Sequence, residues 1–222
     1  MNFELDAPYL EIQSQARDFA RAIEPVAAQA DEMSEIHPGV LAAFRESGLS
    51  DLMVPAAFGG RMERLDPLAI CVVREVLMAT SAHADSMFAL QGIGSYAITA
   101  AGSDAQRNQW LPKVAAAEAL PALALTEPDA GSDLKSITTE LAQDSDGFVL
   151  RGTKSYISNA GAASFYVTFA REESAYSMVL VPADAPGISV TPTPELIAPH
   201  VLGDVLFDDV RLPHSARLGE AG

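Results

Sequence analysis

Hydrophobic positions along the chain follow two different periods, and the change comes near residue 120. Before that point apolar residues recur every three or four positions, which is the spacing of one buried helix face. The first such stretch contains Leu10, Ala16, Phe19, Ala20, Ile23 and Val26. The first half of the sequence therefore predicts an all-helical region.

Local signals divide this region into about five helices. Proline stands at the expected first turn in His37-Pro38 and Asp66-Pro67, and Gly48 ends the second helix. Ser103 caps a fifth helix that runs to about residue 117. Residues 84–101 are rich in alanine, glycine and serine, which predicts an interior helix with close neighbours.

Beyond residue 120 the apolar runs are short, and turn residues separate them. The runs predicted as strands are 121–125, 137–141, 148–150, 165–169, 177–181 and 188–190. Such even spacing predicts a small antiparallel β-barrel or sandwich. The fold class expected is thus α+β, with a helical domain over residues 1–119 and a β-domain over residues 120–222.

Charge and hydropathy exclude several classes of protein. The 14 basic and 30 acidic residues give a net charge of −16, which argues against binding nucleic acid. No apolar run reaches the roughly 18 residues that span a bilayer, and the acidic first residues do not resemble a signal peptide. We expect a cytoplasmic protein that binds neither nucleic acid nor membranes.

The cysteine and histidine residues indicate neither a disulfide nor a metal site. Cys71 is the single cysteine, so no internal disulfide can form, and its apolar neighbours predict a core position. The four histidines, His37, His83, His200 and His214, share no spacing typical of metal ligands. We expect no metal site.

The segment of residues 121–133 predicts a buried strand that runs into a ligand-holding turn. Its apolar first part gives way to Thr126, Glu127, Pro128 and Gly131. Glycine allows close approach of a ligand to the backbone, and Thr126 and Ser132 offer hydroxyl groups. An ordinary strand-to-turn exit remains an alternative on spacing alone.

Five segments in order carry a resemblance to a known family. In chain order they are VPAAFGG (54–60), GSDAQRNQWLP (102–112), LTEPDAGSD (125–133), GTKSYISN (152–159), and FDDVRLP (207–213) with LGE (218–220). Together they closely resemble the acyl-CoA dehydrogenases, which are FAD-dependent flavoenzymes. The resemblance implies an N-terminal helical domain and a middle β-domain, in line with the periodicity.

The resemblance also implies roles for individual residues. By its place in the motif, Thr126 would bond the pyrimidine edge of the flavin, and Ser158 would donate towards flavin N5. Tyr156 would pack as an aromatic plate on the isoalloxazine, although a core aromatic is the alternative. Ser132 would lie near the FAD pyrophosphate and the acyl-CoA substrate, with Gly131 letting the backbone close in. Leu123 and Leu125 would supply backbone contacts to the ring.

The family's catalytic glutamate belongs to a C-terminal helical bundle, and no carboxylate of this chain matches its position. We therefore assign no catalytic residue, and Glu127 is expected to be structural. The 222 residues are expected to be either a fragment or a half-enzyme whose bundle comes from a partner chain, so activity of this chain alone is doubtful. The family also implies electron-transfer flavoprotein or another acceptor as a partner, and an oligomer.

Two further functions stay open. One is a non-catalytic relative that binds a partner chain, and the other is a flavin monooxygenase or oxidase on the same scaffold. Residues 196–204 depart from the family pattern, which usually has an arginine and a Ser-Asp-Thr cluster near the substrate. The acyl group is therefore left open.

Overall fold

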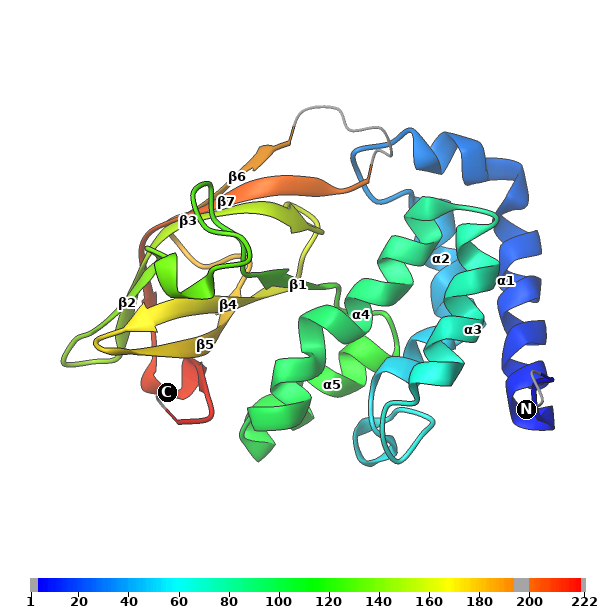
Figure 1. The fold of residues 1–222 in the computed structure, drawn as a ribbon, viewed down its shortest axis with the longest axis horizontal. Helices are drawn as coiled ribbons and strands as arrows, with labels where there is room; N and C mark the ends of the chain where they lie inside the picture. Colours follow the sequence, from blue (N-terminus) through cyan, green and yellow to red (C-terminus); the bar gives the residue numbers. More distant parts are fainter. Residues whose placement is uncertain (1–3, 194–199, 221–222) are drawn as a thin grey trace.

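The structure is a computed structural model that describes residues 4–193 and 200–220. Helices gather on one side of the molecule and strands on the other (Figure 1). Residues 196–199, part of the segment that departs from the family pattern, lie outside the described residues. No helix in the described ranges combines the length and apolar character needed to cross a membrane.

The helices of the first half begin and end where local sequence signals predict. Its α-helices are α1 (Ala7–Asp31), α2 (Pro38–Ser47), α3 (Pro67–Met78), α4 (Ala82–Ala101) and α5 (Asp104–Ala115). The His37 ring accepts the N–H groups of Gly39 and Val40, and Gly48 closes α2 at φ 68°. Ser103 and Gln106 form a reciprocal capping box at the start of α5. The predicted caps are thus confirmed.

The buried helix faces differ in places from those predicted. In α3 the buried positions are Ala69, Val72, Val73 and Leu77, and Cys71 falls on the opposite face and is exposed. The core position predicted for Cys71 is therefore wrong, because an apolar run on a helix still has an outer side. Leu10 is 51% exposed for the same reason, since it lies off the buried face of α1.

Glycine lets α4 pack directly on the first strand, β1 (Pro121–Ala124). A Cβ on Gly94 would lie 2.7 Å from the Cβ of Pro121, and one on Gly92 would lie 2.8 Å from the sulfur of Met53. The small residues therefore serve close packing, as predicted. On the outer side of the same helix Ile93 and Tyr96 are 51% and 58% exposed.

The second half forms a mostly antiparallel sheet. Its remaining strands are β2 (Glu140–Gln143), β3 (Phe148–Ser158), β4 (Phe165–Glu172), β5 (Ala175–Pro182), β6 (Ile188–Pro192), β7 (Leu202–Leu212) and β8 (Arg217–Leu218). The order is β6-β7-β3-β2-β4-β5-β8, and β1 pairs with β4 in parallel. The α+β class is confirmed, with a sheet that stays open between β6 and β8 in the described part.

A shared apolar cluster joins the helices to the sheet. Leu111 and Val114 of α5 and Ile98 of α4 pack with Phe165 and Val167 of β4. The Trp110 ring lies 4.5 Å from the Phe165 ring, measured between centroids. This cluster holds α4 beside the sheet. The candidate site lies between α4 on one side and β1 and β3 on the other.

Candidate functional site

A buried ion pair connects the two motif segments. The Lys154 ammonium lies 2.9 Å from the Glu127 carboxylate and also donates to the Leu125 carbonyl at 2.9 Å. The two side chains are 0% and 3% exposed. Glu127 further accepts hydrogen bonds from the backbone N–H groups of Thr138 and Thr139 and from the Thr138 hydroxyl. Glu127 is therefore structural, as expected.

These contacts keep Glu127 ionised. Burial raises the pKa of its carboxyl, but hydrogen bonds from the Thr138–Thr139 segment and from Lys154 outweigh burial and bring the pKa to about 2. Burial lowers the pKa of Lys154, and Glu127 opposes that shift by favouring the charged ammonium. Each partner thus supplies the charge that makes burial of the other tolerable.

Two further hydrogen bonds connect β1 and the turn after it to β3 and the residue that follows β3. The Ser155 N–H donates to the Thr126 carbonyl at 2.8 Å. The Asn159 side-chain amide donates to the Pro121 carbonyl at 3.0 Å. The start of β1 and the turn that follows β1 are therefore each bonded to residues in or next to β3, and Thr126 and Ser158 belong to one scaffold.

Tyr156 points outward from an irregularity in β3. The pairing of β3 with β7 shifts register between Lys154 and Ile157, and Tyr156 adopts φ 58°. Its N–H donates to the Asp204 carboxylate at 3.3 Å, and its side chain is 63% exposed. The alternative that Tyr156 is a core aromatic is therefore wrong.

The other predicted residues differ in exposure. Leu123, Leu125, Thr126 and Ser158 are half-buried, whereas Gly131 and Ser132 lie on an exposed loop. A Cβ on Gly131 would meet no atom within 4 Å, so packing within the described chain does not require glycine there. The structure ties Leu125, Thr126 and Ser158 to one scaffold, and no hydrogen bond among the described residues ties Ser132 to it.

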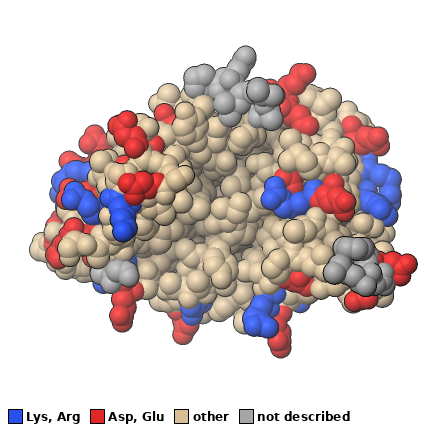
Figure 2. Space-filling model, in the orientation of Figure 1, with Lys and Arg blue, Asp and Glu red and all other residues tan. Residues whose placement is uncertain are grey.

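An apolar cavity opens beside Ser158. Its volume is about 330 Å³, and its lining includes Met78, Ala89, Leu90 and Ile93 with Ser158 and His200. A second cavity of about 410 Å³ continues along α4 past Ile93 to Tyr96. Figure 2 shows the centre of this face hollowed and largely free of charged side chains, which gather towards its margins.

One ion pair lies between these two cavities. Arg74 contributes to both linings and binds the Asp85 carboxylate through two hydrogen bonds of 2.9 and 2.7 Å. The Asp85 side chain is 1% exposed. Its carboxylate is therefore committed to Arg74 and faces the cavity only as part of a neutral pair.

His200 is a site residue that sequence reasoning missed. Its Nε2 lies 3.4 Å from the Ser158 hydroxyl oxygen. The two residues are 42 positions apart, and β7 was not predicted as a strand, so no local pattern indicated the contact. The pairing of Ser158 with Leu202 in the sheet brings them together.

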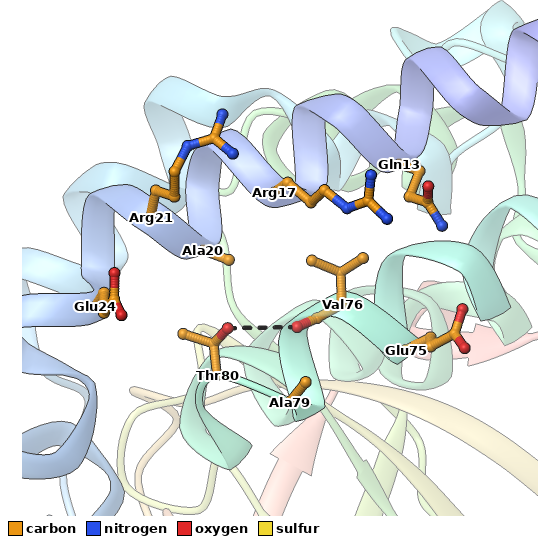
Figure 3. A pocket seen from close by; sticks show the side chains of 9 residues that line it. All are labelled: Gln13, Arg17, Ala20, Arg21, Glu24, Glu75, Val76, Ala79 and Thr80. Atoms are coloured by element: carbon orange, nitrogen blue, oxygen red, sulfur yellow. Dashed lines mark hydrogen bonds between the residues drawn. The ribbon is translucent and has the colours of Figure 1, made fainter.

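A further cavity lies between α1 and α3. Its volume is about 460 Å³, and Arg17, Arg21, Glu24 and Glu75 lie along it. Figure 3 shows Arg21 pointing away from Thr80, which donates to the Val76 carbonyl, and Arg21 pairs with Asp18. Neither motif segment contributes to this cavity, so the candidate site lies beside α4.

Comparison with known proteins decides the family. The sequence model of the acyl-CoA dehydrogenase N-terminal domain matches residues 8–118, and that of the middle domain matches residues 122–210. The chain belongs to the acyl-CoA dehydrogenase family. The resemblance seen in the five sequence segments is therefore confirmed.

Individual relatives agree with this assignment. Acyl-CoA dehydrogenase FadE12 of Mycobacterium tuberculosis is 34% identical over 78% of this chain and 46% of its own length. Cyclohexane-1-carbonyl-CoA dehydrogenase of Geobacter metallireducens is 31% identical over 89% of this chain and 53% of its own length. The chain spans about half the length of these curated relatives.

A solved structure shows the same fold. Glutaryl-CoA dehydrogenase from Mycobacterium smegmatis, crystallised in complex with FADH2, superposes with a TM-score of 0.89 at 27% identity. The match covers 98% of this acyl-CoA dehydrogenase family chain and 57% of the relative. The relative therefore also extends beyond the matched part.

Proposed function

We propose that the chain supplies the flavin-facing and acyl-facing parts of an FAD-dependent acyl-CoA dehydrogenase. The helical domain of residues 1–119 and the β-domain of residues 120–222 would form the two walls of the site. The observation that carries the proposal is the joining of the 125–133 and 152–159 segments beside the apolar cavity along α4. The FADH2 complex of the M. smegmatis relative supports the choice of cofactor.

The side-chain chemistry of Thr126, Tyr156 and Ser158 fits a flat, hydrogen-bonding heterocycle. Thr126 and Ser158 offer hydroxyls on one scaffold, and the exposed Tyr156 ring offers an aromatic plate. Leu123 lies in β1, which pairs with β4, and Leu125 follows directly after this strand. Open space at Gly131 leaves room for a ligand near the loop, with Ser132 near the pyrophosphate and the acyl-CoA.

The acyl group would occupy the cavity between Ser158 and Ile93. Half of its lining residues are apolar, which suits the hydrocarbon part of an acyl thioester; they are Met78, Ala82, Ala89, Leu90 and Ile93. The thioester end would then lie near Ser158, so that its α- and β-carbons face the flavin edge. FAD, when bound, supplies the hydride acceptor, and the protein orients the two reactants.

Removal of the α-proton needs a base within hydrogen-bond reach. Asp85 is bound to Arg74, and Glu127 is buried against Lys154, so both carboxylates are committed. The family resemblance implies that the base belongs to a C-terminal helical bundle, which would be supplied outside these 222 residues by the same protein or by a partner chain. That bundle would cover the exposed side chains of Met78, Ile93 and Tyr96, and an electron-transfer flavoprotein or other acceptor would reoxidise the cofactor.

Calorimetric titration with FAD tests the cofactor assignment. Thr126→Val keeps the side-chain shape but loses the hydroxyl, and we expect FAD affinity to fall about fivefold to tenfold, the value of one hydrogen bond. Thr191→Val, on the exposed surface of β6, is the matched control and should leave affinity unchanged. No FAD binding by the wild-type chain, or equal effects of the two variants, would contradict the proposal. FAD binding without reduction by any acyl-CoA, once the helical bundle is supplied, would identify a non-catalytic relative.

A further inference from the structure

His200 reaches Ser158 across the β3–β7 ladder. Ser158 ends β3 opposite Leu202, and the Asn159 N–H donates to the Val201 carbonyl at 2.8 Å. These backbone contacts hold the imidazole Nε2 at 3.4 Å from the Ser158 hydroxyl oxygen. Both side chains line the same cavity, so the pair faces whatever ligand enters it.

We propose that His200 is a positioning residue that sets the direction of the Ser158 hydroxyl proton. A serine hydroxyl has one proton to donate and lone pairs to accept. When His200 Nε2 carries a proton, it donates to the Ser158 oxygen, and the hydroxyl proton is free for a ligand in the cavity. When Nε2 carries none, Ser158 donates to the imidazole and presents only lone pairs.

The proposal rests on the proposed function in one respect, the identity of the ligand. Ser158 is expected to donate towards flavin N5, which requires its proton to point away from His200. The neutral Nε2–H tautomer of His200 satisfies this requirement, because it makes the imidazole the donor. The proposal therefore requires this tautomer of His200.

Several charged and titratable groups lie near the pair or line the same cavity. Arg74 and Asp85 line the same cavity as a neutral pair. His83 of α4 is buried, and its Nε2 accepts the His37 N–H at 3.2 Å, so that nitrogen carries no proton. Burial lowers the pKa of His83, the nearby His37 and His200 add to the shift, and Asp31 opposes it. Asp204 is engaged by the Tyr156 N–H.

The tautomer can be observed without any cofactor. Two-bond ¹H–¹⁵N correlation spectra of the imidazoles, recorded near pH 8 where an ordinary histidine is neutral, distinguish the two tautomers. We expect the Nε2–H form for His200 and a shift of its Nε2 resonance in Ser158→Ala. An Nδ1–H form, or resonances that Ser158→Ala leaves in place, would overturn the proposal.

A double-mutant cycle then tests the consequence for the ligand. His200→Leu removes the donor, and we expect FAD to bind about fivefold to tenfold more weakly, whereas His200→Gln keeps an N–H donor and should lose no more than about twofold. In a Ser158→Ala background, His200→Leu should have no further effect. Additive losses, or a His200→Gln variant as weak as His200→Leu, would contradict the positioning role.

The outcomes separate this inference from the proposed function. If the wild-type chain binds no FAD but His200 shows the Nε2–H tautomer and responds to Ser158→Ala, the flavin assignment fails and the pair stands. If FAD binds and Thr126→Val weakens it while the tautomer is Nδ1–H, the proposed function stands and the inference fails. Backbone amide spectra of each variant establish that it is folded.

Discussion

Lys154 and Glu127 form an ion pair of 2.9 Å in which neither side chain is more than 3% exposed. The pair lies between the turn after β1 and the middle of β3, the two segments that carry the family motifs. Removing one partner would leave an unpaired buried charge, whereas removing both would not. The pair is therefore one of the contacts that hold Thr126 and Ser158 on one scaffold.

Lys154→Met should lower the free energy of unfolding by about 3–5 kcal/mol, because Glu127 would remain buried without its counter-charge. Arg151→Met is the matched control on the same strand, since Arg151 pairs with Asp209 at the surface, and it should cost less than about 1 kcal/mol. Urea unfolding measures both variants. Equal costs would contradict a special role for the buried pair.

Acid should weaken the fold partly through Glu127. The pKa of this carboxyl is depressed to about 2 in the folded chain, from a value near 4.5 in the unfolded chain. The stability that ionised Glu127 contributes to the fold is therefore complete above about pH 4.5 and is lost as the pH falls through 2. Wild type should therefore lose more stability between about pH 5 and pH 3 than Glu127→Gln, which has no proton to gain. Urea unfolding at the two pH values measures the loss, and parallel losses in the two proteins would contradict this prediction.

Gly94→Ala should destabilise the chain by roughly 1–3 kcal/mol, because the new methyl group would overlap Pro121 and push α4 away from β1. Gly131→Ala is the matched control, since its methyl group would enter open space. It should leave the thermal melting temperature unchanged. If a ligand approaches the backbone at Gly131, the same variant should weaken FAD binding, and calorimetry measures this separately.

The exposed side chains of Met78, Ile93 and Tyr96 should make the chain associate or bind a hydrophobic dye, because contiguous apolar surface usually marks an interface. Ile93→Ser should reduce both effects. Leu10→Ser replaces a similarly exposed side chain on α1 and should change neither. Light scattering that shows a wild-type monomer without dye binding would count against an interface on this face.

Much of the helical half could be predicted from the sequence because its signals are local. His37-Pro38, Gly48 and the Ser103–Gln106 box lie within a few residues of the helix ends that they determine. The strands were harder to predict. A run predicted over residues 137–141 is strand only from Glu140, and β3 continues through the second motif to Ser158.

The missed features depend on pairing between distant residues. Strand β7 was not predicted, and its register with β3 brings His200 to Ser158 and Asp204 to Tyr156. Likewise, Lys154 and Glu127 stand 27 positions apart, and only the fold shows that they share one buried site. The motif indicated which residues matter, whereas the contacts between them required the tertiary structure.

The central claim is that Thr126, Tyr156 and Ser158 face the isoalloxazine of FAD. Titration of the ¹⁵N-labelled chain with FAD, followed by backbone amide spectra, tests it directly and detects even weak binding. We predict chemical-shift changes concentrated at residues 123–132 and 155–159, with few along the cavity between α1 and α3. Changes centred on that other cavity, or no changes at the two motif segments when FAD is saturating, would contradict the account.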